Sequence, residues 1–438
     1  MKSASIVRYA ATVAMVAGLS FVAAPVTLAQ TSTDTTPPSS TDLAKRVDDL
    51  EKQLMDLKAQ LAAQKPAETP ASGPVPAAAV APTTPAPAPI TLSTILGPTT
   101  LSGFVDTYYG YNSNQPASRQ TAYRNFDINS GQLSLNMLEL VADKAVDKTS
   151  PLGYHIALGF GQAMNQINQT EIGPGGTELN FDQYLKEGYM EYLAPVGKGL
   201  QINLGKFVTP AGAEVIESKD NWNYSRGLLF AWAIPYFHYG MSAKYAFNDK
   251  VSLTGYLVNG WNNSVDNNSG KTAGFSLALN PNKKFGIIEN FLFGPEQSND
   301  NSDFRELSDT VVTFTPTAKL SLMANIDYGH DTIPSIPSIS ANWGGVALYA
   351  KYAPNDKYAF AVRGEYFNDH EGFATGVAQN MGEFTATLQR TIAKSIISRV
   401  EFRRDISNQP VFPFRSGFPI SDQNTVSVGV IYAFSTAQ

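Results

Sequence analysis

The side chains best able to carry out chemistry are scarce in this sequence and poorly spaced for catalysis. Among 438 residues there is no cysteine, which excludes a thiol nucleophile, a thiolate metal site and a disulfide. The histidines show no HExxH spacing, and neither a G-x-S-x-G motif nor a phosphate-binding loop is present. They are His155, His238, His330 and His370. We therefore expect no catalytic residue, no metal and no cofactor. An enzyme whose catalytic set the fold assembles from distant residues is an alternative.

Charged side chains are concentrated instead in one long polar segment, residues 208–237. Its charged and aromatic members include Glu214, Glu217, Lys219, Asp220, Tyr224 and Arg226. Charged side chains that ring a narrow pore select solutes by size and by electrostatics. We therefore expect this segment to be the third external loop of a channel, folded inward to form the pore constriction. Thr209 as N-cap and Pro210 in the first turn predict about two helical turns over residues 211–220.

A second set of charged residues alternates with apolar residues on either side of this segment. Arg399 and Glu401, for instance, flank Val400, and a period of two places charges on one face of a strand and apolar residues on the other. The residues expected to line the channel wall are Glu187, Glu191, Lys244, Lys351, Arg363, Glu365, Arg399, Glu401 and Arg403. The alternative is that these charges pair with each other and only fill the interior.

The composition fits a protein with one face in lipid and one in water. Only 16% of residues are charged, below the roughly 25% of a typical soluble domain, while 11% are aromatic and the mean hydropathy is −0.16. The formal net charge of −6 offers no basic surface to nucleic acid and favours cations weakly in a channel. A large secreted β-sandwich protein would have a similar composition.

The elements that must position these charges are strands, because the polarity alternates in short segments from residue 97 to residue 438. We count about sixteen segments, starting near residues 100, 131, 153, 184, 199, 238, 251, 271, 285, 306, 320, 344, 358, 380, 395 and 424. Short turns such as 248–250 alternate with longer polar connections such as 262–270. This alternation is typical of a transmembrane barrel, which closes to satisfy its backbone hydrogen bonds in lipid.

The predicted fold is therefore all-β, a transmembrane antiparallel β-barrel of about 16 strands over residues 97–438, in contact with outer-membrane lipid. Aromatic residues near the ends of the segments are candidates for the girdles at the two membrane interfaces. They include Tyr108, Tyr109, Trp343, Tyr352, Tyr358, Tyr432 and Phe434.

The N-terminal residues 1–29 have the pattern of a secretory signal peptide. Lys2 and Arg8 lead into a short apolar run, and small residues before Gln30 resemble a cleavage site. A single anchoring helix is the alternative, although Gly18 and Pro25 interrupt the run.

Residues 30–64 carry a heptad pattern and predict a short periplasmic coiled-coil helix. Its apolar seam consists of Leu43, Val47, Leu50, Leu54, Leu57 and Leu61. Burial of this seam requires self-association or, alternatively, packing against the barrel or another envelope component. Residues 65–96 are rich in Pro, Ala and Thr and predict an extended, semi-rigid linker.

Several runs of residues in the barrel region resemble the OmpL-like group of β-barrel porins. The longest is Ser102-Gly103-Phe104-Val105-Asp106-Thr107-Tyr108-Tyr109-Gly110-Tyr111-Asn112. The others lie at residues 205–207, 212–217, 223–226, 235–240, 258–262, 363–367, 401–405 and 432–434. The resemblance covers residues 97–438 and implies an outer-membrane channel without fixing its solute. One departure is that four residues follow Phe434, whereas porins usually end in an aromatic residue.

Together these patterns predict a porin in the bacterial outer membrane, with its N-terminal segment in the periplasm. We expect it to be a homotrimer that passes small hydrophilic solutes and ions by passive diffusion, with no nucleic acid as partner. The alternative is a structural envelope protein, in which the barrel anchors a coiled-coil tether that contacts peptidoglycan.

Overall fold

The computed structural model describes Lys52 and residues 97–168, 171–172, 178–179, 182–332 and 340–437. The predicted signal peptide (1–29), coiled coil (30–64) and linker (65–96) lie outside the described residues, apart from Lys52, which is helical and exposed. The chain divides into two compact units, Met1–Pro87 and Ala88–Gln438, and the barrel belongs to the second.

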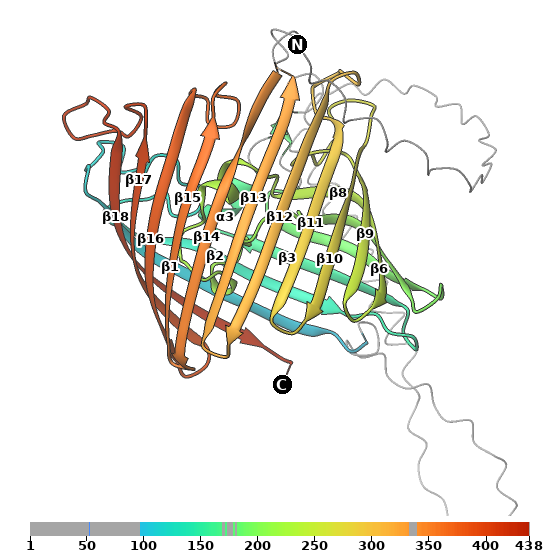
Figure 1. Ribbon diagram of the computed structural model, residues 1–438. Coiled ribbons are helices and arrows are strands. Elements are labelled where there is room, and N and C mark those ends of the chain that lie inside the picture. Colours follow the sequence, from blue (N-terminus) through green and yellow to red (C-terminus); the bar gives the residue numbers. More distant parts are fainter. Residues whose placement is uncertain are drawn as a thin grey trace, which may run out of the picture. The chain divides into compact units, whose positions relative to one another are not determined.

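Sixteen antiparallel strands form one closed barrel (Figure 1). Each strand pairs with the strands that precede and follow it around the barrel, and β18 closes the ring on β1, with Val105 opposite Tyr432. The barrel strands are β1 (Thr100–Asn112), β2 (Gln132–Lys144), β3 (Leu152–Phe160), β6 (Leu185–Ala194), β7 (Leu200–Val208), β8 (Phe237–Asn248), β9 (Val251–Val258), β10 (Thr272–Asn282), β11 (Phe285–Pro295), β12 (Phe304–Thr317), β13 (Leu320–Thr332), β14 (Ser340–Asn355), β15 (Tyr358–Asp369), β16 (Gln379–Ile392), β17 (Ile396–Ser407) and β18 (Asp422–Ser435).

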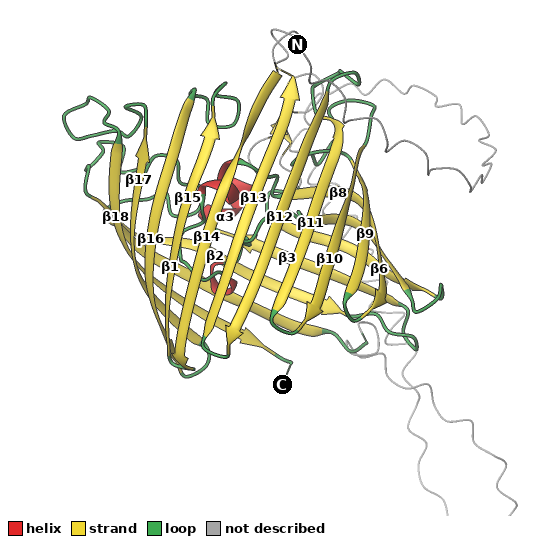
Figure 2. Cartoon of the chain, viewed as in Figure 1, coloured by secondary structure: helices red, strands yellow, loops and turns green. Residues whose placement is uncertain are grey.

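The remaining described elements lie in the connections between these strands. They are the helix α3 (Gln162–Ile167), the two-stranded sheet of β4 (Glu171–Ile172) and β5 (Glu178–Leu179), the 3-10 helix η1 (Ser218–Asp220) and the helix α4 (Leu228–Trp232). Figure 2 shows the red helices inside the ring of yellow strands. No helix in the described part of the chain is long and apolar enough to cross a membrane.

The connections alternate between short turns and long loops, as the sequence predicted. Short turns of residues 249–250, 283–284, 318–319 and 356–357 lie at one end of the barrel. Long loops, among them residues 113–131, 209–236, 259–271 and 408–421, lie at the other end. The described strands begin within a few residues of the predicted starts, so the predicted barrel of sixteen strands is confirmed.

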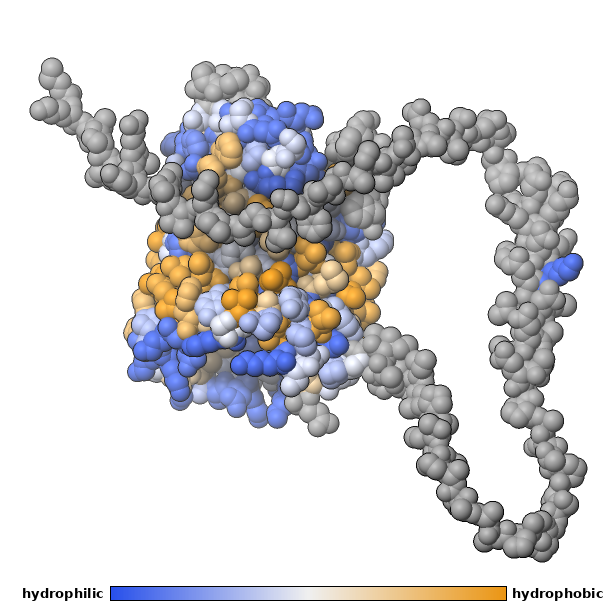
Figure 3. All heavy atoms as spheres, turned by 90° about the vertical axis from the view of Figure 1, so that its right-hand side faces the viewer, coloured by the Kyte–Doolittle hydropathy of each residue, from blue (hydrophilic) through white to orange (hydrophobic). Residues whose placement is uncertain are grey.

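The two faces of the barrel wall differ in polarity. Along β18, Val426, Val428 and Val430 are exposed on the outside, whereas Thr425 and Ser427, which alternate with them, are buried. The same alternation in the other strands produces an apolar belt between two hydrophilic ends (Figure 3). An outward apolar band on a closed barrel is the surface that contacts lipid.

Two of the aromatic residues proposed for the membrane girdles face the interior instead. Tyr108 and Trp343 are buried, because their strand positions place them on the inner face, where loop residues pack against them. Tyr352, Tyr358 and Tyr432 are exposed on the outer face, which is consistent with the girdle prediction.

A charge placed on the outer face tests whether this belt lies in lipid. Leu348 lies midway along β14 and is 60% exposed. We expect Leu348→Arg to lower the free energy of unfolding from lipid vesicles by about 2–4 kcal/mol, because the guanidinium would enter hydrocarbon. The measurement is denaturant unfolding of the vesicle-inserted protein. The control is Phe418→Arg in the last long loop, where Phe418 is 78% exposed. Equal losses in the two variants would contradict a membrane-embedded belt.

Candidate functional site

The third long loop, residues 209–236, connects β7 to β8 and contains η1 and α4. The helix predicted over residues 211–220 is wrong, since only Ser218–Asp220 forms a single 3-10 turn. The physical reason is that the backbone amides of Gly212 and Ala213 donate to Asp309 and Asn325 on the barrel wall, at 3.0 and 3.1 Å. Gly212 also has a φ of +102°, which is not helical.

Charged side chains of β17 bind the backbone of this loop. Arg399 donates to the carbonyl oxygens of Ser218 and Asn221 at 2.5 and 2.6 Å. Glu401 accepts hydrogen bonds from the backbone N–H groups of Tyr224 and Ser225 at 2.5 and 2.9 Å. A loop that crosses a barrel has backbone groups without strand partners, and these wall charges satisfy them.

A cluster of buried ion pairs fixes the middle of the loop to β15, β16 and β17. Arg363 contacts Glu214 of the loop at 2.6 Å and Glu383 of the wall at 2.8 Å, and all three side chains are almost completely buried. Arg403 pairs with Asp405 at 2.7 Å and donates to the carbonyl oxygen of Arg226 at 2.6 Å. Arg363 and Arg403 thus each contact both the barrel wall and the loop.

The loop is also attached to β1, which adjoins β18 at the closure of the barrel. Asp106 accepts hydrogen bonds from the Tyr224 hydroxyl at 2.9 Å and from the Ser218 hydroxyl at 2.6 Å. Tyr224 lies against Gly429 of β18, where a Cβ atom would lie within 2.6 Å of its ring. The absence of a side chain at Gly429 therefore creates the space that the Tyr224 ring occupies.

The structure brings together most of the residues that the sequence singled out for the channel. Loop and wall residues in mutual contact, directly or through the loop backbone, are Glu214, Tyr224, Arg226, Arg363, Glu365, Arg399, Glu401 and Arg403. Glu191, Lys244 and Lys351 lie apart from this network. Glu191 binds Gln201, Lys244 is exposed on β8, and Lys351 lies 5.9 Å from the ring of Trp222.

Three charged residues in the middle of the loop line a cavity. Glu217, Lys219 and Asp220 line a cavity of about 600 Å³ together with residues from the short-turn ends of β1 and β18. The wall residues Glu139, His155, Lys186 and Glu187 line it as well. The loop and the wall thus each contribute carboxylates and cations to this cavity, and Lys186 binds Glu217 directly.

The wall side of this cavity is an ion-pair network that holds the loop edge in place. Lys186 contacts Glu139 at 2.5 Å and Glu187 at 3.4 Å, and it also binds Glu217 of the loop. His155 lies between Asp143 and Glu187, at 2.9 and 3.5 Å.

Sequence reasoning missed several residues of the site. Among them are Asp106, Glu139, Lys186, Asp309 and Asn325. Asn325 alternates with the apolar Ala324 and Ile326 and could have been found by the same period of two, whereas Asp309 lies between the polar Ser308 and Thr310. Lys186 could not be found in this way, because an irregularity in the β3–β6 pairing interrupts the alternation there.

The long-loop end of the barrel carries a second group of charges. Glu296, just beyond the end of β11, accepts hydrogen bonds from the amide of Trp261 and the hydroxyl of Thr272. Burial raises the pKa of Glu296 to about 7, and the nearby Arg305 opposes this only in part. Within the described residues, no group of three or more His, Cys, Asp or Glu side chains could hold a metal ion.

A closed sixteen-stranded barrel with a charged loop bound to its inner wall is the architecture of a porin. The family model "Putative beta-barrel porin-2, OmpL-like" matches residues 98–434. The chain belongs to this family, so its barrel is that of a bacterial outer-membrane porin, and the family and fold indicate a channel and not an enzyme. No curated protein matches the sequence.

Solved porin structures share this fold at low sequence identity. An anion-selective porin from Comamonas acidovorans is 11% identical, with a TM-score of 0.52 over 77% of this chain and 99% of that one. Salmonella typhi OmpF in complex with daunomycin is 12% identical, with a TM-score of 0.51 over 77% and 97%. A trimer form of Vibrio cholerae OmpT is 11% identical, with a TM-score of 0.50 over 77% and 99%. These similarities describe the fold alone.

The buried pair of Arg363 and Glu214 can be tested with a double-mutant cycle. We expect Arg363→Met to lower the free energy of unfolding by about 3–5 kcal/mol, because it leaves buried carboxylates without their cation. Adding Glu214→Gln should recover part of this loss, which gives a coupling energy above about 1 kcal/mol. The measurement is urea unfolding in detergent. The control is Arg404→Met, which breaks an exposed pair with Asp422 at 3.1 Å and should cost about 1 kcal/mol or less. Additive effects in the Arg363–Glu214 cycle would refute the coupling.

The raised pKa of Glu296 predicts a pH-dependent stability of the long-loop end. A carboxyl whose pKa is raised in the folded state stabilises that state below its ordinary pKa, and the contribution is lost as pH rises through about 7. The loss amounts to about 3 kcal/mol for a shift of this size. Thermal unfolding of the parent and of Glu296→Gln should therefore differ in slope between pH 5 and 8. Parallel pH profiles would show that Glu296 titrates normally.

Proposed function

We propose that this porin passes small hydrophilic solutes and ions by passive diffusion, and that the third loop forms its constriction. The observation that carries the proposal is that residues 209–236 form hydrogen bonds with side chains of β1, β12, β13, β15 and β17, including one from the Leu228 amide to Glu365 of β15. A loop held to so many strands narrows the lumen permanently, because its release would leave buried charges unpaired.

The charges of the loop divide into two roles under this proposal. Glu214 and Arg226 are buried and bonded, so they maintain the shape of the constriction without meeting the solute. Glu217, Lys219 and Asp220 face the cavity of about 600 Å³ and are therefore the charges that a passing ion encounters. Lys186 and Glu187 are buried and paired, so they hold Glu217 in place from the wall.

Carboxylates and cations side by side along a narrow passage produce a strong local electric field. Such a field orders water and disfavours apolar solutes, while ions of either sign find a partner. We propose weak cation preference, because the chain carries an acidic excess and the cavity is lined by more carboxylates than cations.

We further propose that the functional unit is a homotrimer, with the N-terminal segment in the periplasm. The exposed apolar side chains around the barrel offer surface for contact with lipid and with other copies. The solved OmpT structure with a trimer form shares the fold and makes this assembly reasonable. Contact of the coiled coil with peptidoglycan is compatible with this arrangement and leaves the channel function unchanged.

Single-channel recording in a planar bilayer tests the proposal. We expect the refolded mature protein to give conductance steps in groups of three, with a reversal potential under a salt gradient that shows weak cation preference. Asp220→Asn should shift the reversal potential towards anions and Lys219→Met should shift it further towards cations, because each removes one charge from the passage.

The matched control is Asp249→Asn, in the two-residue turn between β8 and β9, which should leave the reversal potential unchanged. Folded, inserted protein without conductance would refute the open channel. A normal conductance with equal effects of Asp220→Asn and Asp249→Asn would refute the third loop as the selective constriction.

A further inference from the structure

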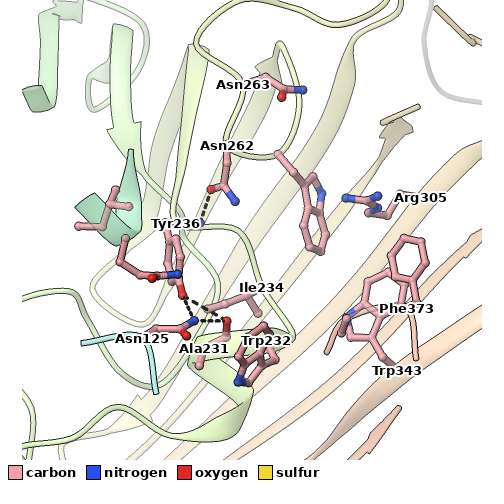
Figure 4. Close-up of a pocket in the computed structure, with 14 residues that line it drawn as sticks. Asn125, Ala231, Trp232, Ile234, Tyr236, Asn262, Asn263, Arg305, Trp343 and Phe373 are labelled. Atoms are coloured by element: carbon pink, nitrogen blue, oxygen red, sulfur yellow. Dashed lines mark hydrogen bonds between the residues drawn. The ribbon is translucent and has the colours of Figure 1, made fainter. Parts of the chain in front are cut away.

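A second cavity, of about 410 Å³, lies at the long-loop end of the barrel (Figure 4). Its lining comes from residues of several long loops and from the first residues of β12 and β14. Six side chains dominate it, namely Trp232, Tyr236, Trp261, Arg305, Trp343 and Phe373. A volume of this size is in the range of small-molecule sites. The third loop separates this cavity from the charged cavity near the short turns, since residues 217–220 line one and residues 231–236 line the other.

The aromatic side chains form a rigid apolar surface. Trp343 stacks on Phe373 with ring centroids 4.9 Å apart, and Trp261 meets Trp343 nearly at right angles at 6.1 Å. The indole N–H of Trp343 donates to the carbonyl oxygen of Ala233 at 3.0 Å, which fixes the ring. Arg305 packs over Trp261 at 4.9 Å. Trp343 is therefore enclosed by its neighbours, at 3% exposure, whereas the half-buried rings of Trp232 and Trp261 remain open to a flat or ring-shaped ligand.

Polar groups without protein partners surround this surface. The side-chain oxygen of Asn262 accepts the amide of Tyr236 at 2.6 Å, but its NH₂ group has no partner among the described residues. The side chain of Asn263 has none in the same part of the structure, and the buried indole N–H of Trp232 is also unbonded there. A buried donor normally finds an acceptor, so the indole N–H of Trp232 is suited to an oxygen atom of a ligand, and the half-exposed side chains of Asn262 and Asn263 are accessible to the same ligand.

The charges of the cavity point to a neutral ligand. Arg305 is neutralised by Asp331, with its Nε 2.7 Å from the carboxylate, while its two terminal nitrogens have no hydrogen bond within the described chain. Glu296 lies next to Trp261 and is the other acid close to Arg305. The cavity therefore has no cation in excess, and an anion would lack the compensating charge that burial requires.

We propose that this cavity is a binding subsite for a neutral saccharide, which it holds at the long-loop end before passage along the third loop. A sugar ring has an apolar C–H face that stacks on indole and a rim of hydroxyl groups that bond to amides, indole N–H and guanidinium. Asn262, Asn263 and Arg305 supply those groups around the half-buried rings of Trp232 and Trp261. The inference rests on the proposed channel function, because it assigns a solute class to the same lumen.

Intrinsic tryptophan fluorescence of the refolded mature protein in detergent tests the subsite. Three of the four tryptophans of the chain line the cavity, and Trp222 does not. We expect a saturable fluorescence change with maltose or sucrose and none with benzoate, a flat anion of similar size. Arg305→Met and Trp261→Phe should weaken the saccharide response at least tenfold, while the control Trp222→Phe should keep its midpoint. Circular dichroism and the heat-dependent gel shift verify folding of each variant.

The outcomes separate this subsite from the channel itself. Saturable saccharide binding that depends on Arg305 and Trp261 supports the subsite, even if bilayer recordings show no conductance and the channel proposal fails. Normal conductance without any saturable saccharide response overturns the subsite and leaves the channel proposal intact. Binding of benzoate in preference to maltose and sucrose, or a saccharide response unaffected by either substitution, also overturns it.

Discussion

The structure depends on one constraint, namely that every backbone hydrogen bond of a wall in lipid must be made within the wall. The closure of β18 on β1, in register from Ser102 opposite Ser435 to Asn112 opposite Thr425, removes the last free edge. Closure in turn encloses a lumen, so alternate residues of each strand must be apolar outside and compatible with water or with loops inside. The separation of exposed Val428 from buried Ser427 follows from this geometry and not from any local propensity.

The same constraint acts a second time inside the barrel. A loop that enters the lumen leaves the strand network, and its N–H and C=O groups need new partners. Arg399 donates to its carbonyl oxygens and Glu401 accepts from its amides, so wall charges serve as backbone partners in place of a neighbouring strand. For this reason a charged residue in the lumen is not automatically a selectivity residue. Glu214 is buried and binds Arg363 and the amide of Gly227, so it is not accessible to a solute. Asp220, in contrast, is exposed.

The period-two pattern allowed the strands and most lumen charges to be predicted, because one face in lipid imposes a strict alternation. It failed where tertiary contacts replace local rules. Residues 211–220 carry a good helix start, yet Asp309 and Asn325 capture the amides that a helix would use, and a single turn remains. Tyr108 and Tyr109 are both girdle candidates by aromatic type, yet only Tyr109 is exposed. A difference of one residue reverses the face of a strand, and aromatic type alone does not decide it.

Two stretches of the third loop, in its middle and at its C-terminal end, border cavities of different chemistry. At residues 231–236 the loop contributes to an aromatic cavity whose charges are paired, and at residues 217–220 it borders a cavity of opposed charges. The stretch between them is anchored through Tyr224 to Asp106 and through Leu228 to Glu365. Under the proposed function, a solute that enters from the long loops would meet the aromatic cavity before the charged one. A neutral solute would then be held by shape and hydroxyl pattern ahead of the proposed constriction, whose electric field gives it no attraction of its own.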